Sequence, residues 1–256
     1  MTLQSARYPD LRDMPVFVTG GGSGIGESVV EHFCDQGAQV TFVDVAAAPS
    51  EALVARVAAS GARPPRFLSC DLRDIDALRA AIADAASATG PIRTLVNNAG
   101  NDDRHRFDTV TVEYWDERMA NNLRHQFFAA QAVHPMMKQA GGGSIVNFGS
   151  ISWMAGEGGY PAYTTAKAAV GGLTKTLARD FGADRIRVNT VVPGWVMTRR
   201  QVELWLDDAG ERQIRERQCL PDKLMPADLA RMVLFLASDD SRMCTGQNFV
   251  VDAGWT

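Results

Sequence analysis

A tyrosine and a lysine four positions apart are the first residues in this chain whose spacing suggests chemistry. Tyr163 and Lys167 lie in the segment 162–181, whose pattern predicts a helix, so both side chains share one helix face, one turn apart. A neighbouring ammonium stabilises a phenolate and lowers the pKa of the phenol from its usual value of about 10. Tyr163 is therefore a candidate base for an alcohol proton. Ser150 follows the predicted strand 144–148 and is a candidate to hold the substrate oxygen.

A glycine-rich segment near the N-terminus gives this pair its meaning, because Tyr-x-x-x-Lys alone also arises by chance on surface helices. The segment Thr-Gly-Gly-Gly-Ser-Gly-Ile-Gly over 19–26 follows an apolar run and opens a helical pattern over 24–36. Glycines there let the backbone approach a pyrophosphate at a helix N-terminus, where free N–H groups and the helix dipole attract anions. The spacing departs from Gly-x-Gly-x-x-Gly, but the mechanics are the same. We expect cofactor contacts from Gly20, Ser23, Gly24, Ile25 and Gly26.

Asp44 ends the predicted strand 39–44, beyond the glycine-rich segment. A carboxylate at this place accepts hydrogen bonds from an adenosine ribose and repels a 2′-phosphate. Neither 45–48 nor 21–23 supplies an Arg or Lys that would attract that phosphate. The sequence therefore predicts NAD rather than NADP as the cofactor.

The elements that must position these residues alternate along the chain. Short β-rich runs and longer helical patterns follow one another almost to the end, which predicts a parallel sheet covered by helices on both faces. We expect a single α/β domain over 1–256, a Rossmann-type doubly wound sheet of seven parallel strands. The expected strands are 16–19, 39–44, 66–70, 94–97, 144–148, 186–192 and 247–251. The expected helices are 24–36, 51–60, 75–88, 112–139 with a possible break, 162–181 and 226–237. The polar segment 198–218 is interpreted as a mobile helical lid over the site.

Composition narrows the class of protein. Hydrophobic residues make up 46% of the 256 residues, and the formal net charge is −4 with Lys and Arg scattered, which gives no reason to expect nucleic acid. No apolar run reaches the roughly 20 residues of a membrane span, and no signal peptide is evident. The four cysteines lie far apart and the four histidines lack ligand spacing, so we expect no metal site, and surface or packing roles for the histidines. These features favour a cytoplasmic protein.

Taken together, the two motifs resemble the short-chain dehydrogenase/reductase family, whose members carry Thr-Gly-x-x-x-Gly-x-Gly early and Ser and Tyr-x-x-x-Lys late. The resemblance covers nearly the whole chain. It implies an NAD-dependent enzyme in which Ser150 and Tyr163 hold the alcohol oxygen and Lys167 holds the nicotinamide ribose. Asn122 would hold a helix backbone so that water reaches Lys167. It implies a homotetramer and further cofactor contacts from Asp71, Leu72, Asn98, Ala99, Gly100, Pro193, Gly194, Val196 and Thr198.

Several longer segments resemble one branch of that family, the NAD-dependent D-xylose 1-dehydrogenases. These segments include 97–105, 114–118, 147–153 and the terminal Asp-Ala-Gly-Trp over 252–255. The resemblance implies oxidation of the anomeric hydroxyl of an aldose to an aldonolactone. Charged groups and indole faces in the loops also suit a small sugar. We expect the sugar beside Asp102, Arg104, Trp153 and Gln201.

Two other functions stay open at this stage. A carbonyl or 3-ketoacyl reductase would use the same scaffold and the same Ser, Tyr and Lys. A dinucleotide-sensing protein without turnover would be expected to have lost one of the three, and Ser150, Tyr163 and Lys167 are all present. The sequence therefore favours an enzyme, with a sugar as the preferred substrate and a reductase as the alternative.

Overall fold

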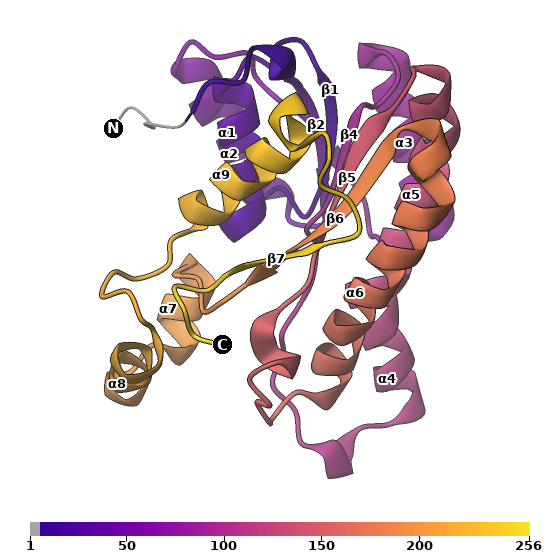
Figure 1. The fold of residues 1–256 in the computed structure, drawn as a ribbon. Helices are drawn as coiled ribbons and strands as arrows, with labels where there is room; N and C mark the ends of the chain where they lie inside the picture. The colour runs from indigo at the N-terminus through magenta and orange to yellow at the C-terminus, as the bar shows by residue number, and fades with distance from the viewer. Residues whose placement is uncertain (1–5) are drawn as a thin grey trace.

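Seven parallel strands form one sheet in the order β3-β2-β1-β4-β5-β6-β7 (Figure 1). The structure is a computed structural model and describes residues 6–256. The predicted Rossmann-type sheet is confirmed. Its strands are β1 Pro15–Thr19, β2 Gln39–Asp44, β3 Arg66–Ser69, β4 Thr94–Asn97, β5 Gly143–Phe148, β6 Ile186–Pro193 and β7 Asn248–Val251.

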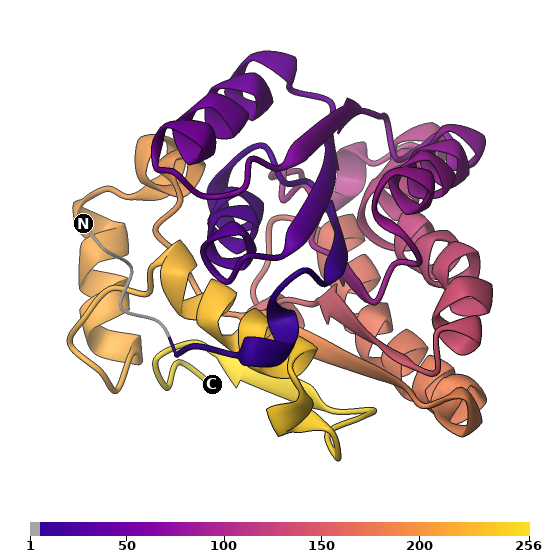
Figure 2. The same cartoon turned by 90° about the horizontal axis from the view of Figure 1, so that it is seen from above.

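Helices cover both faces of the sheet (Figure 2). One layer holds α1, α2 and α9, and the other holds α3, α5 and α6. The helices are α1 Gly24–Asp35, α2 Ala47–Ala59, α3 Ile75–Thr89, α4 Val112–Met119, α5 His125–Gln139, α6 Pro161–Phe181, α7 Arg199–Trp205, α8 Asp208–Arg217 and α9 Pro226–Ala237.

Alternation along β1 feeds a separate apolar core on each face. Val16 and Val18 belong to the core beneath α1 and α9, whereas Phe17 belongs to the core beneath α3 and α5. All three side chains are fully buried, as expected for a strand covered on both sides. Burial of each such side chain contributes about 1.5–3 kcal/mol to the stability of the fold. The C-terminal ends of the strands are therefore supported by a packed apolar core on each face of the sheet.

One predicted helix differs in its start, and the break that the sequence allowed within 112–139 is confirmed. Helix α2 begins at Ala47 rather than at 51, because Pro49 falls in its first turn, where a missing N–H costs little. The predicted helix 112–139 is interrupted by a π turn over Ala120–Arg124. Such a turn inserts one residue into the helix and is frequent at functional sites. It carries Asn122.

The segment predicted as a lid is helical, as expected. Helix α7 is capped by Thr198, whose Oγ1 accepts from the Gln201 N–H at 3.3 Å, and α8 is capped by Asp207. Both helices lie on the side of the sheet where the strands end (Figure 1). The mobility of this segment stays a prediction.

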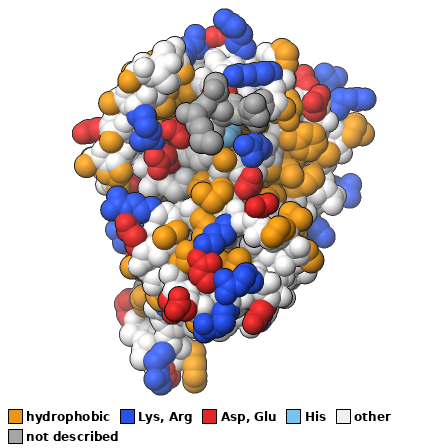
Figure 3. Space-filling model, turned by 90° about the vertical axis from the view of Figure 1, so that its left-hand side faces the viewer, with side chains coloured by type: hydrophobic (Ala, Val, Ile, Leu, Met, Phe, Trp, Pro, Cys, Tyr) orange, Lys and Arg blue, Asp and Glu red, His pale blue; other side chains and the backbone are white. Residues whose placement is uncertain are grey.

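Basic and acidic side chains are interspersed on the face of the molecule shown in Figure 3. Within residues 6–256, no helix combines the length and the apolar character needed to cross a membrane. Across the same residues, no group of three or more His, Cys, Asp or Glu is placed to hold a metal ion.

Candidate active site

A cavity of about 710 Å³ opens beyond the C-terminal ends of the strands, next to β1 and β4. The helix after β1 and the helix after β4 lie on opposite faces, so this is the switch point at which open α/β sheets bind ligands. Most of the predicted site residues line this one cavity: Gly20, Ser23, Ile25, Asp44, Asp71, Leu72, Asn98, Ala99, Gly100, Asp102, Arg104, Ser150, Tyr163, Lys167, Pro193, Gly194, Val196, Thr198 and Gln201. Four do not line it: Gly24, Gly26, Asn122 and Trp153.

Close approach explains the glycines of the turn between β1 and α1. Gly20 has φ +67°, and a Cβ there would lie 2.8 Å from the Cα of Ala99. A Cβ on Gly26 would lie 1.9 Å from the carbonyl oxygen of Gly20. Gly26 therefore does not line the cavity but allows α1 to pack against the glycine turn. Ser23 precedes α1 without a side-chain hydrogen bond to it, which leaves the first N–H groups of the helix free for an anion.

Polar side chains fasten the ends of β1 and β4 to each other. The Thr19 hydroxyl accepts from the backbone N–H groups of Asn98 at 3.1 Å and Ala99 at 3.2 Å. The Asn98 amide donates to the carbonyl oxygens of Thr19 at 3.2 Å and Gly20 at 2.8 Å. These bonds fix the position of the glycine turn relative to the end of β4.

Asp44 directs its carboxylate at the same turn. Its Oδ2 accepts from the Gly22 N–H and its Oδ1 from the Ala46 N–H, both at 2.9 Å. At the end of the next strand, Asp71 is held by Arg73 at 2.7 Å, and the guanidinium lowers the pKa of the Asp71 carboxyl. A glycine turn, a free helix N-terminus and a strand-end carboxylate thus face one cavity, and they fit a dinucleotide.

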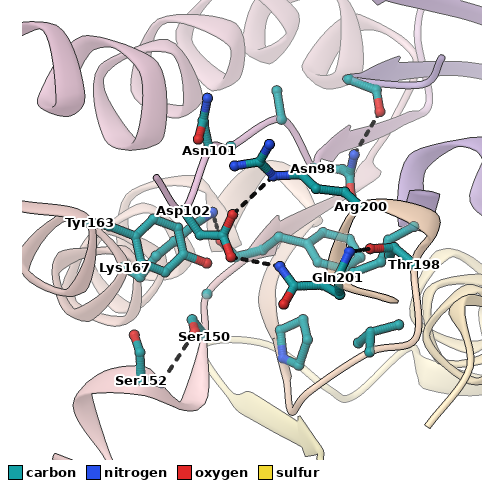
Figure 4. A pocket seen from close by; sticks show the side chains of 18 of the residues that line it. Asn98, Asn101, Asp102, Ser150, Ser152, Tyr163, Lys167, Thr198, Arg200 and Gln201 are labelled. Atoms are coloured by element: carbon teal, nitrogen blue, oxygen red, sulfur yellow. Dashed lines mark hydrogen bonds and ion pairs between the residues drawn. The ribbon is translucent and has the colours of Figure 1, made fainter. Parts of the chain in front are cut away.

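Helix α6 carries the predicted acid–base pair into the cavity (Figure 4). Tyr163 lies in its first turn and Lys167 one turn later, with the Lys167 Nζ 5.8 Å from the centre of the Tyr163 ring. Lys167 is 3% exposed, and its Nζ donates to the carbonyl oxygen of Phe148 at 2.9 Å. The Ser150 Oγ accepts from the Ser152 N–H at 3.2 Å, and its hydroxyl also acts on the Tyr163 phenol, so both hydroxyls face the same point of the cavity.

The pKa of Tyr163 differs from the sequence-based expectation in direction. Burial raises the pKa of this phenol, the Asp102 carboxylate raises it further, and the Ser150 hydroxyl acts in the opposite sense. The prediction that Lys167 lowers the pKa is wrong for this structure: burial is the largest cause of the shift, and the groups that act in the lowering direction are the Ser150 hydroxyl and the Arg104 guanidinium. Burial also lowers the pKa of Lys167 to about 8, against the effect of Asp102.

Asn122 lies near Lys167 but outside the cavity lining. It is fully buried in the π turn, donates to the Arg118 carbonyl oxygen at 3.0 Å and accepts from the Asn101 N–H at 2.8 Å. A Cβ on Gly100 would lie 3.0 Å from the Lys167 Nζ and 3.1 Å from the Asn122 Oδ1. Asn122 therefore joins the helix, the loop after β4 and the neighbourhood of the ammonium.

Helix α7 is fastened to the loop after β4 across the mouth of the cavity (Figure 4). The Gln201 amide donates to Asp102 Oδ2 at 2.7 Å. The Arg200 guanidinium lies 3.4 Å from Asp102 and 2.6 Å from Asp103. We call these three contacts the α7 latch. Arg104 lies over the ring of Tyr160 at 4.0 Å and that of Trp205 at 5.1 Å.

Trp153 is the predicted substrate residue that the structure does not bring into the cavity. It lies in the 3-10 turn Ile151–Trp153 and is 44% exposed. The turn caps on Ser150, which takes the serine inward and leaves the indole outside the lining. The sequence analysis missed other lining residues: Glu157, Tyr160, Arg200 and Gln213. Glu157 and Tyr160 lie in the loop between Ser150 and Tyr163, a position that would have pointed to them.

One cavity joins the glycine turn to the Tyr163–Lys167 pair, and this arrangement is typical of an oxidoreductase that works with a dinucleotide. A family model described as enoyl-(acyl carrier protein) reductase matches residues 20–256. With its Tyr-x-x-x-Lys pair and its fold, the chain belongs to the short-chain dehydrogenase/reductase family, whose members bind a nicotinamide cofactor.

Known proteins resemble this chain along nearly its whole length. It is 51% identical to a protein named probable galactose dehydrogenase from Rhizobium meliloti, over 99% of each chain. It is 50% identical to D-xylose 1-dehydrogenase from Caulobacter vibrioides, over 99% of this chain and 100% of that protein. The crystal structure of a blue fluorescent protein from a metagenomic library, in complex with NADPH, is 35% identical and has a TM-score of 0.86, covering 96% of this chain and 99% of that one.

Proposed function

We propose that this chain is an aldose 1-dehydrogenase that oxidises the anomeric hydroxyl of D-xylose or a similar pentose or hexose to the aldonolactone, with NAD as the hydride acceptor. The observation that carries the proposal is the single cavity that runs from the glycine turn to Ser150, Tyr163 and Lys167 and ends among polar side chains. The two sugar dehydrogenases that are about half identical to this chain support the substrate class.

In the proposed reaction, Ser150 and Tyr163 hold the anomeric oxygen between them. The Ser150 O–H donates to that oxygen, and the Tyr163 phenolate accepts its proton. When bound, NAD supplies a ring that accepts the hydride and a positive charge that favours the phenolate. That charge matters because burial alone raises the pKa of Tyr163. An anomeric hydroxyl is also more acidic than an ordinary alcohol, which makes it easier to deprotonate.

Lys167 passes the proton onward in this scheme. Its pKa of about 8 lets it exchange a proton near neutral pH. The Nζ lies beside Gly100, and so does the Asn122 amide oxygen. Asn122 in turn fixes the loop backbone at Asn101. The route from the phenol therefore leads through Lys167 toward the π turn.

NAD is proposed over NADP because of the charges at the adenosine end. Asp44 presents its carboxylate there, and a 2′-phosphate would meet that negative charge. The Lys and Arg residues among the described residues that line the cavity are Arg104, Lys167 and Arg200. All three lie at the catalytic end, beside Tyr163 or Asp102, so none of them would offset the charge of Asp44.

Asp102, Arg104 and Gln201 are proposed to bind the sugar hydroxyls. Asp102 raises the pKa values of Tyr163 and Lys167, and this supports a role for its carboxylate close to the reacting oxygen. A carboxylate, a guanidinium and an amide offer both donors and acceptors, as polyols require. Trp153 is not included, because it lies outside the cavity lining.

The test is a panel of aldopentoses and aldohexoses with purified protein and either NAD or NADP, followed by the absorbance of the reduced cofactor. We expect sugar-dependent reduction, a lactone product detected as its hydroxamate, and a kcat/KM at least about tenfold higher for NAD. Equal kcat/KM values for the two cofactors would contradict the choice of NAD.

Two rivals predict other outcomes of the same panel. A carbonyl or 3-ketoacyl reductase would oxidise NADH with a ketone or a ketoacyl thioester and would leave every aldose untouched. A sensor without turnover would bind NADH tightly and catalyse neither reaction. Either result would remove the sugar assignment.

Replacement of Tyr163 by Phe tests the base. We expect Tyr163→Phe to lose nearly all turnover, because the variant lacks the group that accepts the proton, while its Kd for NADH stays within about threefold. Initial rates and a fluorescence titration with NADH measure the two quantities. A variant that keeps more than about a tenth of wild-type kcat would show that another group is the base.

A homotetramer and a cytoplasmic location are also proposed, from the family resemblance and the composition. Light scattering at micromolar concentration tests the oligomeric state, and a monomer would contradict the tetramer.

A further inference from the structure

His105 lies outside the cavity lining, yet it joins the loop after β4 to the start of the catalytic helix. Its ring Nε2 accepts a hydrogen bond from the backbone N–H of Ala162 at 3.2 Å. Its own backbone N–H donates to the Gly159 carbonyl oxygen at 2.7 Å. The two bonds bracket the beginning of α6, the helix that carries Tyr163.

Helix α6 lacks a cap of its own. Tyr160 precedes the helix without a side-chain hydrogen bond to it, and Pro161 at the first position has no N–H. The Ala162 N–H is therefore the first donor of the helix, and no intrahelical carbonyl lies in reach of it. His105, 57 residues earlier in the chain, provides the acceptor.

Three further contacts fix the imidazole. Because Nε2 accepts a hydrogen bond, the proton of the neutral ring lies on Nδ1. Nδ1 is 2.9 Å from the Asp103 carbonyl oxygen and 3.0 Å from the Tyr114 hydroxyl. The Tyr114 ring also packs edge-on against the imidazole, with centroids 4.9 Å apart. Side chain and backbone of three elements thus set the position of this ring.

We propose that His105 is a positioning residue that sets where the Tyr163 phenol lies relative to Asp102 and Ser150. Ala162 immediately precedes Tyr163, so a shift of the first N–H of α6 moves the phenol. Asp102 belongs to the same loop as His105, so the bond from the ring to Ala162 couples the position of that loop to the position of the phenol. The proposal rests on the proposed function, in which Tyr163 is the base, and it adds a residue that the reaction needs without touching the sugar.

Two amide variants separate the two edges of the ring. In His105→Gln the amide oxygen reaches the place of Nε2 and still accepts from the Ala162 N–H. In His105→Asn the shorter amide occupies the place of Nδ1, where it donates to the Asp103 carbonyl oxygen but leaves Ala162 without an acceptor. Both variants are neutral and polar, so the difference between them isolates the bond to the helix.

We expect His105→Asn to lower kcat by about 10- to 100-fold, because small misplacements of a reacting group cost that much. The KM of the sugar and the Kd of NADH should stay within about threefold of wild type. His105→Gln should keep more than about a third of wild-type kcat. Amide exchange at residues 162–165 should be faster in His105→Asn and unchanged in His105→Gln.

The exchange readout needs no substrate, so it separates this proposal from the proposed function. If wild-type protein oxidises no aldose, the proposed function fails, and the exchange rates still decide whether His105 holds the helix. Unchanged kcat in His105→Asn would overturn the positioning role. Equal losses of kcat and of melting temperature in both variants would also overturn it, because they would show that the ring only supports the fold.

Discussion

At the scale of single residues, the Asp102 carboxylate is the group that most clearly shapes the chemistry of its neighbours. It raises the pKa of the Tyr163 phenol and also that of the Lys167 ammonium. A carboxylate beside a base that must become negative is unfavourable unless it serves binding. Its bonds to Gln201 and Arg200 offset part of its charge, and a sugar hydroxyl would donate to it as well. In the proposed reaction, Asp102 therefore links the pKa of the Tyr163 phenol to the contacts that hold α7.

Replacement of Asp102 by Asn should therefore move the pH profile. Because the carboxylate raises the pKa of Tyr163, its removal lowers that pKa, and the phenolate forms at lower pH. We expect the ascending limb of kcat against pH to shift to lower pH in Asp102→Asn. The amide oxygen of Asn still accepts from Gln201, so the fastening of α7 is largely kept. Initial rates with saturating sugar and NAD across the pH range measure the shift.

Asp103→Asn is the matched control, since it removes one negative charge from the adjacent residue. Asp103 pairs with Arg118 at 3.1 Å and with Arg200, and it is not among the groups that shift the pKa of Tyr163. In Asp103→Asn, the ascending limb of kcat against pH should lie at the same pH as in the wild-type protein. A limb that stays in place or moves to higher pH in Asp102→Asn would refute the role given to the carboxylate.

At the scale of elements, most of what the sequence predicted lies in strand ends and helix starts. The glycine turn, Asp44, Ser150, Tyr163 and Lys167 were predictable because their contacts come from local backbone direction, which a short pattern encodes. The seven strands were predictable for the same reason. The His105 bond to Ala162 was not, because it joins residues 57 positions apart through the geometry of two loops.

The pKa of Tyr163 was the other point that the sequence did not give correctly. A spacing of four residues indicates that an ammonium is near a phenol, but it does not indicate how much water the fold removes from both. In the structure, burial is the largest cause of the shifts of Tyr163 and Lys167. Trp153 shows the same limit, since its distance from Ser150 in sequence says nothing about which side of the turn faces the cavity.

Helix α7 is held to the loop after β4 by the α7 latch, and the strength of this attachment can be measured. The α7 latch contains one bond from a neutral amide to a carboxylate, from Gln201 to Asp102, and a hydrogen bond to a charged group contributes about 1.5–3 kcal/mol. We expect amide exchange over residues 199–217 of the cofactor-free protein to be about 10- to 100-fold faster in Gln201→Ala. Exchange followed by mass spectrometry measures it and also tests the predicted mobility of this segment.

Glu203→Gln is the control for that experiment. It removes the ion pair with Arg199 on the same helix, at 2.7 Å between two exposed side chains, and exposed pairs of this kind contribute little. Its exchange should match wild type. If Gln201→Ala also matches wild type over 199–217, the latch does not hold the helix.

At the scale of the whole molecule, the site depends on how closely the two layers of helices approach the sheet. Helix α1 reaches the glycine turn only because Gly26 lacks a side chain: a Cβ there would lie 1.9 Å from the Gly20 carbonyl oxygen and 2.5 Å from the Asn98 amide nitrogen. Asn98 fastens β4 to β1. One atom at position 26 would therefore disturb a helix, a turn and two strands together.

Gly26→Ala should accordingly lose both stability and cofactor affinity. Overpacking of this kind costs about 1–3 kcal/mol, and each kcal/mol lowers the melting temperature of a chain of this size by about 2–4 °C. The same shift moves the Gly20 backbone away from the proposed phosphate site, so the Kd for NADH should rise.

Gly182→Ala is the matched control: its backbone has φ −59° and ψ −37°, and nothing lies within 4 Å of the added carbon. That variant should melt at or above the wild-type temperature, because alanine restricts the unfolded chain. Thermal unfolding and NADH fluorescence measure both effects, and a Gly26→Ala protein with wild-type melting temperature and wild-type Kd would show that the turn tolerates a side chain where the structure leaves no room for one.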